Sequence, residues 1–202
     1  MITIDLGSSI VTYVILAVLA WLGFVNGFRY MVSIALFETL GYVLTVQSGD
    51  FLIGLINRFY SNLPKLFAFL LGRDTGSVDA LGPVIPDNFQ APLLLRVLVF
   101  VALLAVGIGY AFPWEKRLKG YQGDRALRLL GALTGLYVGA LGITAASTFW
   151  NDGAAALNWP PLIATALSGL PNFAPVAPSL ITAFAILIAI IILIRFNRVW
   201  KP

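Results

Sequence analysis

The sequence contains no cysteine and no histidine, and only two methionines. Without cysteine, the chain can form neither a disulfide nor a thiolate-ligated metal site. Without histidine, it lacks a common metal ligand, the usual general base and any Ser-His-Asp triad. The remaining residues offer no nucleophile–base pair and no cluster of metal ligands. We therefore predict a protein that is not an enzyme and that binds no cofactor or metal.

Charged residues are scarce as well. They make up 11% of the chain, whereas hydrophobic residues make up 59%, and the mean hydropathy is +0.91. Soluble proteins carry about 25% charged and about 45–50% apolar residues. The composition is therefore typical of an integral membrane protein, and the length predicts a single membrane domain over residues 1–202. Asp5 but no lysine or arginine precedes the first apolar segment, which is unlike a cleaved signal peptide.

Five apolar segments are candidates for membrane spans. A helix rises about 1.5 Å per residue, so roughly 20 residues cross the hydrocarbon core of a bilayer. The segments are residues 8–27, 30–47, 92–113, 127–149 and 179–195. We therefore predict an all-α integral membrane protein with five transmembrane helices.

The segment 50–72 has a different pattern, because its polar residues recur on one face at a spacing near four. These residues are Asn57, Arg58, Ser61, Asn62 and Lys65. Pro64 lacks an N–H group and breaks or kinks a helix. We therefore predict two short amphipathic helices that lie in the membrane interface. A polar loop follows at 73–91, and the proline-rich segment 150–178 is predicted to be a non-helical or re-entrant loop.

Lysine and arginine are distributed unequally between the two sides that five spans define. Nine of the 13 lie in the 27–30 turn, the 114–128 loop and the C-terminal tail, and four lie on the other side. Because cytoplasmic loops carry the excess of positive charge, we predict that the N-terminus is outside and the C-terminus is cytoplasmic.

The basic loop after the third span is a candidate for binding anionic lipid headgroups, at about 1 kcal/mol per basic residue. Its basic residues are Lys116, Arg117, Lys119, Arg125 and Arg128. The alternative is that they serve only as an orientation signal. Glu115 and Asp124 interrupt the loop, and no aromatic stacking platform accompanies it, so we predict no binding of nucleic acid.

Glycines mark where spans approach each other closely. Gly23 and Gly27 lie at the junction of the first two spans, and Gly131, Gly135 and Gly139 recur every four residues in the fourth. Residues four apart share one helix face, and glycine on that face lets another backbone come near. We expect this stripe to pack within the chain, against the first two spans. Homo-oligomerisation or docking to another protein is the alternative.

Several of these motifs occur together in a known order. They are Ile4-Asp5, Gly23-Phe24 with Gly27-Phe28-Arg29, the amphipathic segment, a third span, and Asp124-Arg125 followed by Leu129-Leu130-Gly131-Ala132, Gly135-Leu136 and Gly139. Over about residues 1–150 this resembles the CvpA (colicin V production) family of bacterial inner-membrane proteins. The resemblance implies a four-helix unit in the bacterial inner membrane, linked to colicin V export, envelope integrity or tethering of a protease.

The chain also differs from that family. Asn26 precedes Gly27-Phe28 where the family has arginine, no protease domain is present, and residues 151–202 add a proline-rich loop and a fifth helix. We interpret these differences as those of a specialised relative.

Two charged residues fall within predicted spans. Glu38 lies near the middle of the second span, where a charge costs about 2.5–3.5 kcal/mol or more. One hypothesis makes it a proton relay or ion ligand, and the other makes it a protonated carboxyl that is hydrogen-bonded between helices or to a partner subunit. Arg96, one turn inside the third span, is expected to reach the outer headgroups, and pairing with Glu38 is the alternative.

The sequence therefore predicts a membrane scaffold or accessory subunit of a larger bacterial inner-membrane assembly, whether secretory, envelope-related or energy-transducing. Its partners would be membrane lipids and other membrane-protein subunits, with a homo-oligomer as a further option. The alternative function is a small transporter or channel component that uses Glu38 for proton or ion coupling.

Overall fold

The computed structural model describes residues 6–85, 90–118, 125–153, 170–171 and 173–199. This part of the chain consists of helices joined by turns and loops, and it contains no strand. Its elements are α1 (Leu6–Asn26), α2 (Phe28–Tyr42), the π-helical turn η1 (Val43–Gln47), α3 (Gly49–Leu70), the short 3-10 helix η2 (Thr75–Ser77), α4 (Gln90–Leu118), α5 (Arg125–Gly153) and α7 (Ala177–Val199). The predicted all-α class is confirmed.

Three helical stretches are long and apolar enough to cross a membrane. They are Phe28–Gln47, Pro92–Ala111 and Arg125–Gly153, which correspond to the second, third and fourth predicted spans. The first and fifth predicted spans form shorter apolar helical stretches, Ile10–Asn26 and Ala177–Ile191. The chain therefore has the helices of a membrane protein.

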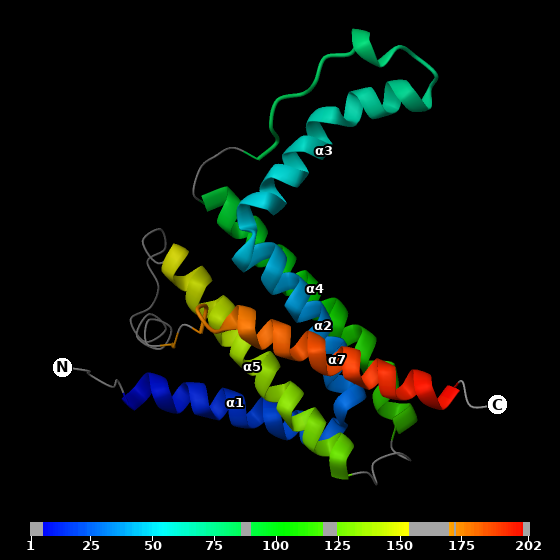
Figure 1. Cartoon of the computed structure of the whole chain (residues 1–202). Helices are drawn as coiled ribbons and strands as arrows, with labels where there is room; N and C mark the ends of the chain where they lie inside the picture. The colour runs from blue at the N-terminus through cyan, green and yellow to red at the C-terminus, as the bar shows by residue number, and fades with distance from the viewer. Residues whose placement is uncertain (1–5, 86–89, 119–124, 154–169, 172, 200–202) are drawn as a thin grey trace.

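The helices form a bundle whose centre is α5 (Figure 1). The largest interfaces join α1 to α5, α2 to α4, and α2 to α5. Fully buried side chains from α2 and α5 make the core, among them Met31, Ala35, Leu141 and Ala145. Helix α3 extends away from this bundle, and none of its residues belongs to the buried core cluster.

The structure corrects the prediction of two short helices around Pro64. Helix α3 is continuous from Gly49 to Leu70 and contains Pro64 in its interior. A proline removes one helical hydrogen bond, but the turns on either side keep theirs, so a helix can bend at this point instead of ending. The ribbon of α3 changes direction along its length (Figure 1).

Two further boundaries differ from the prediction. Helix α4 continues past Pro113 to Leu118, and α5 continues to Gly153, so both helices extend beyond the predicted ends of the third and fourth spans. Pro113 again costs a single backbone bond inside a long helix. Much of the predicted 150–178 loop, residues 154–169, lies outside the described residues.

Glycines allow α1 and α5 to cross in backbone contact. A Cβ atom added to Gly131 would overlap the carbonyl oxygen of Gly23, and one added to Gly23 would overlap the carbonyl oxygen of Gly131. A Cβ atom on Gly135 would likewise overlap the carbonyl oxygen of Leu19. A side chain at any of the three positions would push the two helices apart, because neither backbone can move aside cheaply.

The other two predicted glycines have different surroundings. Gly139 faces the Leu16 side chain, with 2.8 Å between an added Cβ atom and Leu16 Cδ2. Gly27 has a φ angle of 82°, in the left-handed region that favours glycine, and a Cβ atom there would meet no other group. Its N–H donates to the Gly23 carbonyl oxygen at 2.8 Å. Gly27 therefore makes the tight turn from α1 into α2.

The α1–α5 contact predicts a difference between two glycine variants. Gly135→Ala should lower the free energy of unfolding by about 1–3 kcal/mol, since the added methyl group forces the backbones apart. Gly109→Ala is the matched control, because a Cβ atom on this α4 glycine meets nothing within 4 Å. Denaturant unfolding in mixed micelles would measure both. Equal effects at the two positions would show that the contact is not tight.

Candidate functional site

Glu38 is buried in the centre of the bundle. It lies on α2 and is 2% exposed. Its Oε1 atom lies close to α5, because a Cβ atom added to Gly142 would be 3.0 Å from this oxygen. Its Oε2 atom is buried and has no hydrogen-bond partner among the described residues. A buried polar atom without a partner is uncommon in native proteins and calls for an explanation.

The sequence offers polar neighbours for Glu38 on its own helix and across the packing, among them Ser33, Thr39, Thr134 and Tyr137, but in the structure these bond elsewhere. Ser33 and Thr134 each donate to a backbone carbonyl one turn earlier in their own helices, those of Arg29 and Leu130. The polar contact between α2 and α5 is made by Thr39, whose hydroxyl lies 2.6 Å from the Tyr137 hydroxyl. The interhelical hydrogen bond that we considered for Glu38 is therefore made by its neighbour in sequence.

Tyr137 also connects α5 to α7. Its ring stacks on that of Phe184, with 4.4 Å between centroids and 17° between planes. Phe184 is 6% exposed and belongs to the hydrophobic core. No pattern in the sequence indicates this stack, because α7 is almost uniformly apolar and its periodicity does not show which face is buried.

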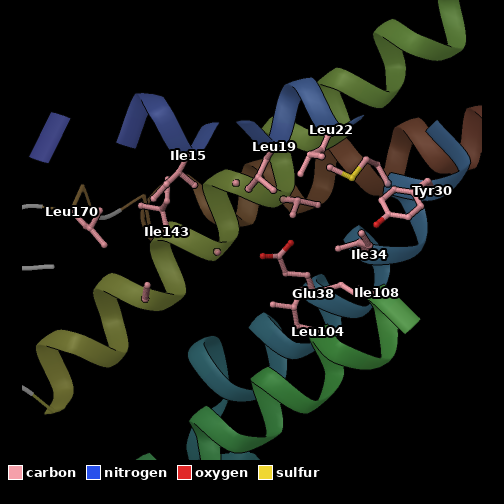
Figure 2. Close-up of a pocket in the computed structure, with 15 residues that line it drawn as sticks. Ile15, Leu19, Leu22, Tyr30, Ile34, Glu38, Leu104, Ile108, Ile143 and Leu170 are labelled. Atoms are coloured by element: carbon pink, nitrogen blue, oxygen red, sulfur yellow. The ribbon is translucent and has the colours of Figure 1, made fainter. Parts of the chain in front are cut away.

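The Glu38 carboxyl group faces an apolar cavity of about 420 Å³. Figure 2 shows the carboxyl oxygens pointing into the space between the surrounding helices. The walls come from α1, α2, α4 and α5, and from Leu170 at the edge of the described chain. Leu19, Leu22, Ile34, Leu104, Ile108 and Ile143 are among the lining residues.

Glycines on α5 help to create this cavity. Gly139 and Gly142 both line it without adding a side chain to its wall, and Gly142 is the one that faces Glu38. The same stripe that brings α1 against α5 at Gly131 and Gly135 therefore leaves an opening further along the helix. The sequence predicted the stripe but not the cavity, since a cavity depends on how three or more helices cross.

Arg96 does not pair with Glu38, and its guanidinium contacts other groups of its own chain. Its Nε atom donates to the Thr45 carbonyl oxygen at 2.5 Å, and its Nη1 atom lies 3.5 Å from Asp152 Oδ2. The guanidinium also lies over the Phe149 ring, 5.9 Å from the centroid. These contacts hold Arg96 against the π-helical turn. Gly49, at the start of α3, leaves room for it, because a Cβ atom there would overlap the guanidinium.

The predicted lipid-binding residues lie near the α4–α5 connection. Arg125 begins α5, and Arg128 lies over the Phe24 ring at 5.4 Å from the centroid, so its guanidinium is engaged with α1. Lys116 and Arg117 belong to the last turns of α4, and Lys119 lies outside the described residues.

The Arg96 contacts predict a ranking of two variants. Arg96→Met should reduce the free energy of unfolding by about 1.5–3 kcal/mol, because it removes a charged donor from a backbone carbonyl. Asp152→Asn should cost less than about 1 kcal/mol, since the Asp152 side chain is 37% exposed and the ion pair is screened. Unfolding in mixed micelles would compare them. Equal losses would mean that the ion pair, and not the carbonyl bond, holds Arg96.

Comparisons with protein-family models, with curated proteins and with solved structures find no match for this chain. The resemblance to the CvpA family therefore stays a prediction from the motifs.

Proposed function

We propose that the protein is a non-catalytic membrane scaffold or accessory subunit of a larger assembly in the bacterial inner membrane. In this proposal the bundle crosses the membrane five times, and α1 and α7 are the first and last spans along the chain. The N-terminus is outside and the C-terminus is cytoplasmic. The CvpA-like motifs and the unequal distribution of lysine and arginine support this placement.

The observation that carries the proposal is the arm formed by α3. One side of this helix is apolar and rich in aromatic residues, and these large side chains are exposed. The exposed residues on that side include Phe51, Leu55, Phe59, Leu66, Phe69 and Leu70. An amphipathic helix of this kind lies in the membrane interface with its apolar side towards the acyl chains.

The opposite side of α3 is covered by the chain's own loop. The Asn57 side chain donates to the Ile85 carbonyl oxygen at 3.2 Å and accepts from the Ile85 N–H at 2.9 Å. The Leu81 N–H donates to the Ser61 carbonyl oxygen at 3.1 Å. The arm is thus fastened on its polar side, which leaves the apolar side to meet lipid or a neighbouring subunit. An arm of this form extends the contact surface of a small protein without adding catalytic groups.

Helix α7 supplies a second surface for a partner within the membrane. Ile186, Ile190 and Leu193 are exposed and follow each other at spacings of four and three, so they form one stripe. Phe184 belongs to the side that packs on Tyr137. A smooth aliphatic stripe suits close packing against another transmembrane helix or against lipid.

The scaffold proposal predicts that assembly depends on the apolar side of α3. A tagged chain extracted from bacterial inner membranes in mild detergent should migrate above its own mass of 21.8 kDa, together with partner polypeptides. The double variant Leu55→Ser, Phe59→Ser should lose them while it stays in the membrane. The double variant Arg58→Ser, Asn62→Ser changes exposed polar positions on the same turns and should keep them. A wild-type chain that migrates as a monomer would contradict the proposal.

The second candidate function is proton or ion coupling through Glu38, and the buried, unpartnered Oε2 atom favours it. A coupling path needs further polar groups on either side of the carboxyl. Among the described residues that line the cavity, however, the only other one with a side-chain nitrogen or oxygen is Tyr30. Apolar walls replace none of the hydration shell of an ion, so the scaffold remains our leading proposal.

Proteoliposomes separate the two functions. We expect the same proton and potassium leak from liposomes that contain wild-type protein and from those that contain Glu38→Gln, because the cavity walls offer no polar path. Measurement with a pH-sensitive dye inside the liposomes, under an imposed potential, would check this. A leak that falls in Glu38→Gln, but not in the control Gly109→Ala, would favour the transporter.

A further inference from the structure

The surroundings of Glu38 have the properties of a ligand site. Its Oε2 atom is a strong hydrogen-bond acceptor that is buried and has no partner in the described chain. Loss of a partner costs such a group more than the net gain from an ordinary hydrogen bond. A molecule that donates a hydrogen bond to this oxygen inside the cavity would remove that penalty, which favours its binding.

The cavity limits what the rest of the molecule can be. A volume of about 420 Å³ lies within the range of roughly 300–1,000 Å³ that small-molecule pockets occupy. Apart from Glu38 and Tyr30 its described walls are apolar, and α5 contributes Gly142 opposite the carboxyl. Walls of this kind favour hydrocarbon and exclude a molecule with several polar groups, which would lose its hydration without replacement.

The rim of the cavity indicates where a ligand would enter. Leu22 on α1 and Ile108 on α4 line the cavity and are nevertheless 40% and 39% exposed. Ala146 on α5 is a third exposed residue of the lining, and all three are aliphatic, which suits an opening towards hydrocarbon. Ligands would reach the carboxyl from within the bilayer.

We propose that Glu38 and the apolar cavity around it form a binding site for a lipophilic molecule with one hydrogen-bond-donating head, a hydroxyl or an amine, on a hydrocarbon body. The head donates to Oε2 of Glu38, and the body lies against the aliphatic walls. A fatty acid anion fits poorly, because its carboxylate offers no proton to Oε2 and would lose its hydration in the apolar cavity. This site does not depend on the scaffold function.

Carbodiimide labelling tests the site in the unmodified chain. The protein in phosphatidylcholine nanodiscs is treated with the hydrophobic reagent dicyclohexylcarbodiimide, and adducts are mapped by peptide mass spectrometry. We expect modification at Glu38, since the reagent is lipophilic and the cavity opens to lipid. A water-soluble carbodiimide should modify exposed acids such as Asp74 and leave Glu38 unmodified.

Competition identifies the head group. Dodecanol or dodecylamine should slow modification of Glu38 at roughly tenfold lower concentration than dodecane, the ratio expected from one buried hydrogen bond. The better of the two competitors shows whether the site takes a hydroxyl or an amine. Dodecanoate should compete no better than dodecane. Equal protection by all four compounds, or no modification of Glu38, would overturn the proposal.

A variant links the competition to the cavity. Gly142→Ala places a methyl group 3.0 Å from Glu38 Oε1 and keeps the carboxyl that reports labelling. For each protein, the labelling rate is first normalised to its rate without competitor. The concentration of the preferred competitor that halves this rate should then be about tenfold higher for the variant than for the wild-type chain. Gly109→Ala should leave that concentration unchanged. An unchanged value for Gly142→Ala would place the ligand elsewhere and overturn the assignment.

The experiment is independent of the proposed partner complex, because it uses the purified chain alone. A chain that binds a lipophilic alcohol but migrates as a monomer would retain this site and lose the scaffold function. A chain that assembles with partners but shows no donor-specific protection would retain the scaffold function and lose this site.

Discussion

The backbone contact between α1 and α5 is the constraint on which the rest of the bundle depends. Gly23, Gly131 and Gly135 leave no room for a side chain at the crossing, so the two helices are held at a fixed point and must diverge beyond it. In lipid there is little hydrophobic force between helices, and close van der Waals contact of this kind replaces it. The cavity beside Gly139 and Gly142 lies further along α5, where α1 no longer covers it so closely.

The spacing of the glycines predicted a packed face, and the expectation that it packs against the first two spans agrees with the α1 contacts, although the spacing alone does not identify the neighbour. A period of four residues defines which side of α5 is smooth, and it carries no information about which helix occupies that side. The same holds for α2, whose buried residues Met31 and Ala35 give no sequence signal that distinguishes α4 from α5 as partner. Helix ends were predicted least well where proline was treated as a terminator, as at Pro64 and Pro113, because a long helix can lose one bond and continue.

Charged residues within the spans were located correctly along the chain, but their partners were not predictable. Arg96 meets Asp152, which is 56 residues away in sequence, and the carbonyl of Thr45 in a π-helical turn. A π-helical turn leaves irregular backbone acceptors that no residue pattern marks in advance. For Glu38 the sequence suggested several polar neighbours, and the structure instead pairs Thr39 with Tyr137. Which of two adjacent polar residues faces a neighbouring helix depends on a rotation of about 100° per residue.

This arrangement separates folding from the chemistry of Glu38. The glycine crossing, the Thr39–Tyr137 bond and the Tyr137–Phe184 stack connect α1, α2, α5 and α7, and none of them uses the carboxyl. A buried acceptor without a partner lowers stability, so the fold would tolerate an uncharged residue of similar shape at this position. Packing therefore gives no reason for a carboxyl at position 38, whereas a ligand that donates to Oε2 does. Because the fold does not need the carboxyl, changes made there report on binding or transport and not on collapse of the bundle.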